Sequence, residues 1–457
     1  MSEEIIEAVP EDSDDEVASD SPESPSVGHE VDDFVRRIES LAGTLPRVMF
    51  AVQSEARGAS ERFNDYAAKF GTVAAQDEHV ITYSFKPPYD VRAAQLSERE
   101  KRAGVASELL PTVLVLALVG QFDAFVGRLL RVLFLLRPEL IEASERSLTF
   151  SQLMDLGSIE AAREYVLEKE IETVLRKSHP DQFTWMENKF KIELRKGLPS
   201  WKTFVELTER RNLFAHTNGI VSDQYLINCR EHEVEIPADC IRGTELAVDP
   251  DYFRNAYSCM LELGVKLSQV LWRKLIPEEL ENADDSLNEV AYSLIIAKRY
   301  ELAVELLDFG CCVLKKHSSE QKRKVLQINR AQAYKWMGDE GASLKVLESE
   351  DWSACGLDFQ LAIAVLKDEF DVAAEIMRSI GDNGDVNETA YQEWPLFQEF
   401  RKSEEFLAAF EQVFGEPFFH LEQALRESEL AKQREALEAL KSTLDEDLDE
   451  EAEPAQQ

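Results

Sequence analysis

Apolar side chains recur every three to four residues over most of this chain, which is the spacing of one face of an α-helix. The pattern predicts helices over residues 34–75, 108–136, 150–155, 159–177, 182–196 and 200–215. Proline or glycine punctuates these segments, as at Pro138, Pro180 and Gly219, because neither residue continues a helix readily. We interpret residues 34–104 as an N-terminal helical extension and residues 105–230 as a helical bundle.

Two segments depart from the helical spacing. Residues 79–91 are predicted to be extended, because they are rich in β-type residues and run into two prolines. Residues 233–248 hold β-type residues around Arg242 and Gly243, which favours a small hairpin. A helix is predicted over residues 250–275, so residues 231–285 are interpreted as a linker that contains a hairpin and a helix.

A degenerate repeat occupies residues 286–416. Its clearest copies are RYELAVELL, DEGASLKVL and EFDVAAEIM, which begin at residues 299, 339 and 369. Each copy places a small residue, Ala303, Ala342 or Ala373, where a neighbouring helix is expected to approach closely. These three alanines are separated by 39 and 31 residues, which resembles the tetratricopeptide period of about 34. Residues 394–415 are predicted to form an amphipathic helix that closes the stack.

The net charge of −38 is distributed unevenly. Residues 1–33 hold thirteen Asp and Glu and no Lys or Arg, and they lack periodic apolar positions, so we expect a disordered acidic tail. Residues 417–457 are interpreted as a charged helix and a second acidic tail. Residues 34–230 are nearly neutral, with 27 basic and 26 acidic residues. The overall charge therefore argues against generic nucleic-acid binding, but an RNA site within the neutral half remains open.

Cysteine usage and the N-terminus indicate a cytoplasmic protein. The six cysteines form no CxxC pair and no Cys/His spacing suited to zinc, so buried free thiols are expected rather than a metal site or a disulfide. The first sixteen residues carry acids where a secretory signal requires basic residues. The longest apolar run, residues 109–120, is too short to span a bilayer and is predicted to be a core helix.

One short motif carries candidate chemistry. Residues 211–216 spell Arg-Asn-Leu-Phe-Ala-His near the predicted C-terminal end of a helix, and a long apolar helix precedes them in the bundle. This combination resembles the HEPN domain, over roughly residues 105–230. The fold class implied is all-α, with a HEPN-like helical bundle followed by a tetratricopeptide-like α-solenoid and acidic tails.

The resemblance implies a metal-independent endoribonuclease in which Arg211 and His216 match the motif Arg and His, and Asn212 matches the polar residue that often follows the Arg. The residue types suit this reaction. A histidine exchanges protons near neutral pH, an arginine binds phosphate through two N–H groups, and an amide orients either partner. No cofactor and no metal ligand set is predicted. The family context further implies a bacterial toxin, stress or defence system.

Helix geometry limits what one chain can do with this motif. At 100° per residue, Arg211 and His216 lie about 140° apart, so one straight helix cannot direct both at the same atom. Either the helix ends before His216, as Thr217-Asn218-Gly219 suggests, or two copies contribute to one site. HEPN domains generally dimerise through this region, so the resemblance implies a homodimer.

Asp123 is a further candidate, because it lies on the same helical stripe as apolar residues such as Val119 and Val126. A carboxylate that faces the core requires a partner. One interpretation is that Asp123 pairs with Arg211 and positions it, as an acidic residue of the first long helix does in several HEPN domains. The alternative is a purely structural pair or an exposed position.

A basic run precedes the motif and is the predicted RNA-binding face. Its members are Lys189, Lys191, Arg195, Lys196, Lys202 and Arg210, and Tyr225 is added as a residue that stacks on bases. The alternatives are a solvated charged surface and a core tyrosine. His179, which precedes a proline, is given no role.

Two functions follow from these patterns. In the first, the protein is a dimeric endoribonuclease whose helical repeats bind a protein partner. In the second, the bundle only dimerises, and the acidic helical stack is a scaffold for protein partners. Loss of metal-independent RNA cleavage on replacing His216 distinguishes them.

Overall fold

The computed structural model describes residues 25–76, 81–142, 147–419 and 428–435. The chain divides into two compact units, residues 1–279 and residues 280–457. Both units are mostly helical, which confirms the all-α class at the level of secondary structure. Residues 1–24, which make up most of the predicted N-terminal tail, lie outside the described residues, as do residues 420–427 and 436–457.

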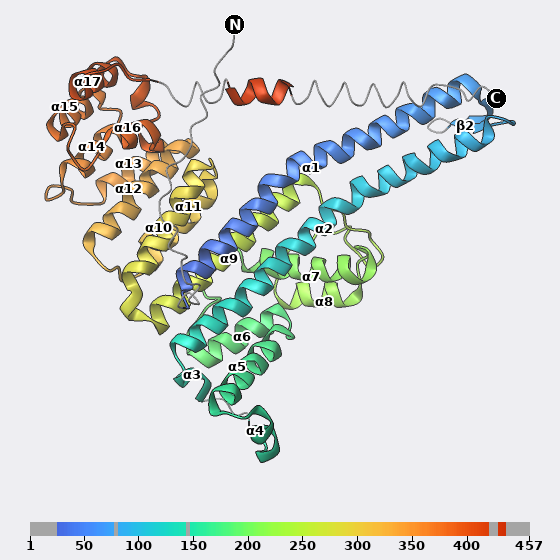
Figure 1. Cartoon of the computed structure of the whole chain (residues 1–457), viewed down its shortest axis with the longest axis horizontal. Helices are drawn as coiled ribbons and strands as arrows, with labels where there is room; N and C mark the ends of the chain where they lie inside the picture. Colours follow the sequence, from blue (N-terminus) through green and yellow to red (C-terminus); the bar gives the residue numbers. More distant parts are fainter. Residues whose placement is uncertain (1–24, 77–80, 143–146, 420–427, 436–457) are drawn as a thin grey trace, which may run out of the picture. The chain divides into compact units, whose positions relative to one another are not determined.

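The N-terminal unit contains nine α-helices and one two-stranded sheet among the described residues (Figure 1). Its elements are α1 (Val27–Phe70), β1 (Thr72–Gln76), β2 (Ile81–Ser84), α2 (Asp90–Leu136), α3 (Glu139–Glu142), α4 (Phe150–Leu156), α5 (Ile159–Leu175), α6 (His179–Phe190), α7 (Trp201–Thr217), α8 (Asp223–Glu231), α9 (Pro250–Leu275) and η1 (Pro277–Glu279).

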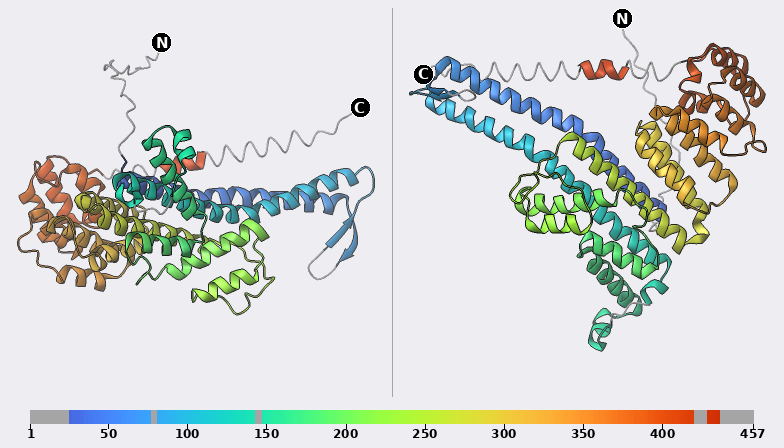
Figure 2. Two further views of the ribbon diagram at one scale, coloured as in Figure 1. Left: turned by 90° about the horizontal axis from the view of Figure 1, so that it is seen from below. Right: turned by 180° about the vertical axis from the view of Figure 1, so that it is seen from behind.

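The two longest helices, α1 and α2, run side by side as an antiparallel arm (Figure 1). The antiparallel strands β1 and β2 join them at the far end of the arm, as Figure 2 shows from two further sides. Cross-arm hydrogen bonds fix the pairing, from Arg128 to Glu30 at the base (2.6 Å) and from Ser60 to Glu100 further out (2.8 Å). In the described part of the outer arm, the buried residues are mostly alanines, so the two backbones pack closely.

The core of the unit lies where the base of the arm meets α9. Phe34 of α1 stacks on Phe125 of α2, with ring centroids 4.2 Å apart. A Cβ atom added to Gly264 of α9 would lie 2.2 Å from the Phe34 ring, so only glycine allows α9 to approach α1 at this point. The helix α9 has the bounds that the sequence predicts and is largely buried.

Several predicted boundaries differ from those observed. The N-terminal unit combines the predicted extension (34–104), the bundle (105–230) and most of the linker (231–285). Residue 104 lies inside α2, because Asp90 to Leu136 form one continuous helix. Residues 27–33, which the sequence assigns to the disordered tail, form the first turns of α1, where Val27 and Val31 are buried.

The hairpin predicted within residues 233–248 is absent from this described segment. Its extended residues pair instead with the chain that follows α7, through an antiparallel bridge between Ile220 and Glu245. Backbone hydrogen bonds from Val221 to Thr244 (2.9 Å) and from Leu246 to Gly219 (3.0 Å) complete this pairing. By contrast, the extended segment predicted at residues 79–91 is observed in part, because residues 81–84 form β2, which pairs with β1.

The apolar run at residues 109–120 is only partly a core helix. Val115, Leu118 and Val119 are buried, whereas Leu109 and Val113 are 56% and 44% exposed on the arm. Among the described helices, α2 is the one long and apolar enough to cross a membrane by length and composition. The core helix of a globular unit satisfies the same criteria, and the C-terminal part of α2 has that role here.

The C-terminal unit is built from helices that pack in consecutive pairs (Figure 1). Its elements are α10 (Leu280–Ile296), α11 (Tyr300–Asp308), the π-helical turn η2 (Phe309–Val313), α12 (Glu320–Met337), α13 (Glu340–Glu348), α14 (Leu357–Leu366), α15 (Phe370–Ile380), α16 (Glu388–Glu393), η3 (Pro395–Phe397), η4 (Phe400–Lys402) and α17 (Glu404–Phe414). The three repeat copies coincide with α11, α13 and α15.

The fourth residue of each of these three helices is small and buried. Ala303, Ser343 and Ala373 occupy this position and are at most 1% exposed. The sequence interpretation selected Ala342 in the second copy, which is one residue too early, since Ala342 is only half-buried. A small side chain at this position lets the preceding helix of each pair lie close.

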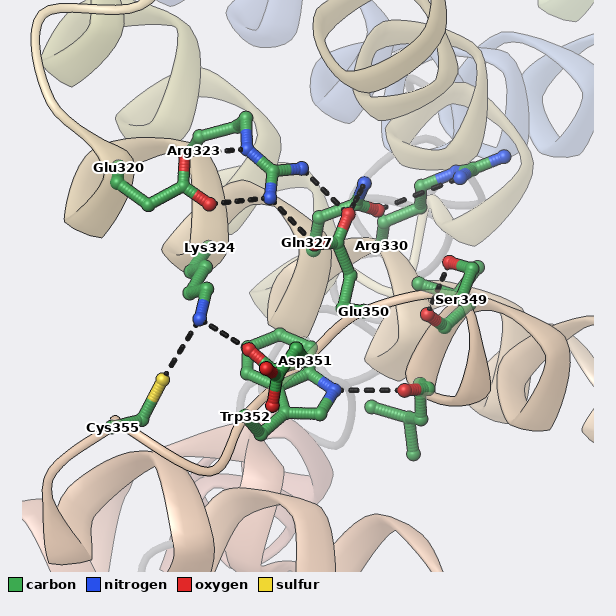
Figure 3. A network of polar contacts seen from close by, with 12 residues as sticks. Glu320, Arg323, Lys324, Gln327, Arg330, Ser349, Glu350, Asp351, Trp352 and Cys355 are labelled. Atoms are coloured by element: carbon green, nitrogen blue, oxygen red, sulfur yellow. Dashed lines mark hydrogen bonds and ion pairs between the residues drawn. The ribbon is translucent and has the colours of Figure 1, made fainter.

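A charged network joins α12 to the segment that follows α13 (Figure 3). Arg323 donates to Glu350 at 2.6 Å and also bonds Glu320, while Gln327 donates to Glu350 at 3.0 Å. Lys324 lies 3.1 Å from the Cys355 sulfur. The hydrogen bond from Arg323 holds the pKa of Glu350 below its usual range. The network therefore ties α12 to the segment that connects α13 and α14.

The single amphipathic helix predicted over residues 394–415 is broken into η3, η4 and α17. Pro395 begins the first short helix, and Ser403 caps the N-terminus of α17. Buried Arg401 donates to the carbonyl oxygens of Tyr391, Gln392 and Trp394, so the irregular segment keeps its backbone acceptors satisfied. Within the predicted charged C-terminal helix, residues 428–435 are helical.

Candidate functional site

The Arg-Asn-x-x-x-His motif lies on α7, which continues through His216 to Thr217. Asn218 ends the helix in the left-handed conformation (φ 51°), and Gly219 follows at φ 82°. Asparagine and glycine tolerate positive φ better than other residues. The helix therefore ends after His216. This excludes the sequence interpretation in which the helix ends before His216.

Arg211 and Asp123 form the ion pair that the sequence suggested. Arg211 Nη2 donates to Asp123 Oδ2 at 3.2 Å, which joins α7 to α2. Arg211 Nη1 donates to Asn212 Oδ1, also at 3.2 Å. The Arg211 and Asp123 side chains are 30% and 27% exposed. The guanidinium is thus oriented by two partners while part of it faces solvent.

His179 completes this cluster, although the sequence interpretation gave it no role. Its Nε2 lies 2.8 Å from Asp123 Oδ1, so the carboxylate contacts His179 and Arg211 through different oxygens. The histidine is 7% exposed and begins α6, where Ser178 is the N-cap and Pro180 the second helical residue. A helix start at the Ser-His-Pro-Asp sequence was readable from capping rules, but its proximity to Asp123 was not.

His216 lies outside this cluster. It is exposed in the last turn of α7, and among the described residues no protein group forms a hydrogen bond or ion pair with it. Since α7 remains helical from Arg211 to His216, the two side chains point about 140° apart. One chain therefore does not direct both at a single phosphate.

Two residues of the predicted RNA-binding face are enclosed. Tyr225 is 1% exposed, and its hydroxyl donates to Glu206 at 2.8 Å. Arg210 donates to the same carboxylate at 2.6 Å, and its guanidinium lies 4.0 Å from the centre of the Tyr252 ring. Tyr252 donates to the other oxygen of Glu206 at 3.0 Å. As placed, Tyr225 cannot stack on a base, and Arg210 serves the packing of α7, α8 and α9.

Most other members of the basic run have acidic partners. Arg195 pairs with Glu187, Lys196 with Glu193 at 2.9 Å, and Lys202 with Glu233 at 3.6 Å. Lys189 and Lys191 have no such partner among the described residues. Lys202 is also displaced from the end of the motif, because it lies about 21 Å from His216 along α7.

No group of three or more His, Cys, Asp or Glu side chains suited to a metal ion occurs in the described part of the chain. The cysteines are free, and Cys229, Cys240 and Cys259 are buried as expected. Burial raises the pKa of the Cys229 thiol to about 12, which makes it a poor nucleophile. Cys312 departs from the expectation, since it is exposed within η2.

Comparison of this chain with protein families, with curated proteins and with solved structures finds no match. What the site can do must therefore be inferred from its side chains. A guanidinium fixed on one side by Asp123 and open on the other suits an anionic group such as a phosphate. An exposed imidazole at the end of the same helix suits proton transfer.

Proposed function

We propose that this protein is a metal-independent endoribonuclease that acts as a homodimer. The observation that carries the proposal is the Asp123–Arg211–Asn212 cluster, in which the arginine is oriented and still partly exposed. His216 is exposed on the same helix. The resemblance of residues 211–216 to the HEPN motif supports the same chemistry, and the toxin, stress or defence context rests on that resemblance.

The proposed reaction is transesterification by the RNA 2′-hydroxyl. One imidazole accepts the proton of the 2′-hydroxyl, and the 2′-oxygen attacks phosphorus. The bond from phosphorus to the 5′-oxygen breaks, and that oxygen takes a proton from solvent, to which the imidazolium returns the proton that it accepted. The products are a 2′,3′-cyclic phosphate and a 5′-hydroxyl, so no water is consumed. Arg211 stabilises the negative charge on the non-bridging oxygens.

The dimer follows from the position of His216 relative to Arg211. Because the two side chains diverge on one helix, a phosphate held by Arg211 requires an imidazole from a second copy. A twofold axis near the C-terminal end of α7 would place His216 of each copy beside Arg211 of the other. An active strict monomer in solution would refute this part of the proposal.

The test is cleavage of RNA in EDTA by the wild-type protein and by His216→Ala and Arg211→Ala variants. We expect metal-independent cleavage that falls by at least roughly 100-fold in either variant. His232→Ala is the matched control, since His232 lies in the same unit but outside the cluster, near Trp201. Equal inertness of wild type and variants would contradict the enzyme proposal.

Mixing the two inactive variants tests the composite site. In randomly formed dimers, half of the molecules combine one chain of each type, and one of their two sites has an intact Arg211 and an intact His216. Cleavage at roughly a quarter of the wild-type rate is therefore expected. No recovery after subunit exchange would show that both residues act within the same chain.

The second candidate is a non-catalytic HEPN-like dimerisation module with a scaffold of tetratricopeptide-like repeats. The observation that favours it is that most of the predicted basic face is neutralised by acidic partners or buried. The C-terminal unit also exposes large apolar side chains on its helices, including Val372 at 42% and Leu344 at 40%. Such residues are suited to contacts with a protein partner.

A further inference from the structure

The two carboxylate oxygens of Asp123 contact side chains on two different helices. Oδ2 accepts from Arg211 of α7 at 3.2 Å, and Oδ1 lies 2.8 Å from His179 Nε2 of α6. An ionised carboxylate only accepts hydrogen bonds, so this contact requires the tautomer in which Nε2 carries the hydrogen. With both oxygens bonded, the carboxylate plane cannot rotate freely about its Cβ–Cγ bond. The guanidinium that it holds is fixed as well.

His179 is itself held rigidly. It is 7% exposed, and its ring packs edge-on against Phe204 of α7, with centroids 5.6 Å apart. The start of α6 is secured by Ser178, which accepts from the Asp181 backbone N–H at 3.3 Å. Gln182 donates from its side chain to the carbonyl oxygens of Leu175 and Lys177. The imidazole is therefore a fixed point of the bundle and not a mobile surface group.

The exposures along this chain of contacts increase stepwise. The His179 side chain is 8% exposed, that of Asp123 is 27%, and that of Arg211 is 30%. Arg211 uses two of its N–H groups on Asp123 and Asn212, and its remaining N–H groups have no protein partner among the described residues. The contacts thus run from a rigid interior anchor to a partly exposed anion-binding group.

We propose that His179 is a positioning residue, which fixes Asp123 and through it directs the Arg211 guanidinium toward a phosphate of bound RNA. This inference rests on the proposed function for the identity of the ligand. His179 does not contact the substrate, because it is enclosed behind Asp123. Its contribution is orientation, and small errors in the orientation of a charged group lower the rate strongly.

The first experiment compares His179→Phe with His179→Gln in the full chain. Phenylalanine fills a similar volume but cannot donate, whereas the glutamine amide places an N–H near the position of Nε2. We expect His179→Phe to lower kcat for RNA cleavage on the order of 100-fold, with a smaller change in KM. His179→Gln is expected to restore most of this loss. Equal loss in both variants would overturn the positioning role.

A double-mutant cycle separates positioning from a general effect on folding. In an Arg211→Met background, His179→Phe should cause little further loss of RNA affinity or cleavage, because its effect passes through Arg211. Additive losses would show that His179 acts independently and would contradict the proposal.

The same cycle distinguishes this inference from the proposed function. If the wild-type protein neither binds nor cleaves RNA, the ribonuclease proposal fails. The coupling between His179→Phe and Arg211→Met is then measured by urea unfolding of the full chain. Non-additive effects on the free energy of unfolding would support the coupling of His179 to Arg211 through Asp123. Strictly additive effects would contradict this coupling.

Discussion

The two units of this protein reach helical packing by different means. In the N-terminal unit, buried or half-buried polar groups join the helices, as in the Glu206 contacts with Arg210, Tyr225 and Tyr252. In the C-terminal unit, a continuous apolar cluster and small residues such as Ala303 carry most of the packing, and buried Arg401 adds bonds to backbone carbonyl groups within one segment. Polar contacts are directional, so they fix the orientation of one helix relative to another. Apolar contacts mainly set the distance between helices and the volume of the side chains between them.

The difference bears on where chemistry is found. The Arg211 cluster lies in the unit whose helices are joined by polar contacts, and its orientation depends on side chains from α2, α6 and α7. The C-terminal unit repeats a local pattern of paired helices, which is suited to presenting a surface to another molecule. Perturbing each kind of contact tests whether this contrast holds.

The largest effect is expected from Glu206→Ala. Glu206 is 12% exposed and bonds one arginine and two tyrosines on α7, α8 and α9. Its removal leaves the mostly buried Arg210 without its carboxylate partner, which costs about 3–5 kcal/mol of unfolding free energy. Chemical unfolding of the full chain, followed by hydrogen exchange in α7 and α8, measures the loss.

Glu206→Gln serves as the control for this prediction. The amide oxygen still accepts from one or two of the three donors, so we expect a smaller loss of unfolding free energy. If alanine and glutamine were equally mild, with less than about 1 kcal/mol lost in each, the polar contacts would not be what holds these helices together.

A smaller effect is expected from Ala303→Leu in the C-terminal unit. Ala303 is fully buried where α11 meets its neighbours, so added methyl groups should cost about 1–3 kcal/mol through overpacking. Thermal unfolding of the full chain measures this loss.

Ser343→Ala is the matched change at the equivalent position of α13. Among the described residues, the buried Ser343 hydroxyl has no hydrogen-bond partner, so its removal should leave stability unchanged or raise it by up to about 1 kcal/mol. If Ala303→Leu were also harmless, the fourth position of these helices would not limit their approach.

The smallest effect concerns pH. The hydrogen bond from Arg323 lowers the pKa of Glu350 below the ordinary 4.5. A carboxyl with a lowered folded-state pKa adds stability above its unfolded pKa, and this contribution is lost as pH falls through the folded value. Acid should therefore weaken the C-terminal unit below about pH 4.5.

Arg323→Met sharpens this prediction. The substitution should cost roughly 1 kcal/mol at neutral pH and should flatten the acid dependence of unfolding between pH 5 and 3. Unfolding curves of the wild type and the variant at several pH values provide the comparison. An unchanged acid dependence would show that the Arg323 network does not contribute to stability.

Part of this architecture could be read from local patterns. Helical spacing and an Asp-Pro start give α9 its bounds, and the three repeat copies coincide with α11, α13 and α15. The polar position of Asp123 on an apolar stripe indicated a partner, and the Arg211 pair is present. These features depend on residues within a few turns of one helix, where spacing and capping rules apply directly.

Other features depended on residues that are distant in the sequence. His179 meets Asp123 across 56 positions of the chain, and Tyr225 is enclosed by Glu206 and the chain after α8. The hairpin expected within residues 233–248 is not formed, because the backbone at Glu245 pairs with Ile220 instead. No local pattern specifies which of several donors and acceptors will meet.

The sequence by itself determined the helical class, the paired helices of the C-terminal half and the six residues that suggest phosphate chemistry. Only the tertiary structure decided that Arg211 is oriented by Asp123 and His179 while His216 points away from them. The physical reason is that periodicity records which face of a helix is apolar, whereas the direction of a side chain depends on the packing of helices that are remote in sequence.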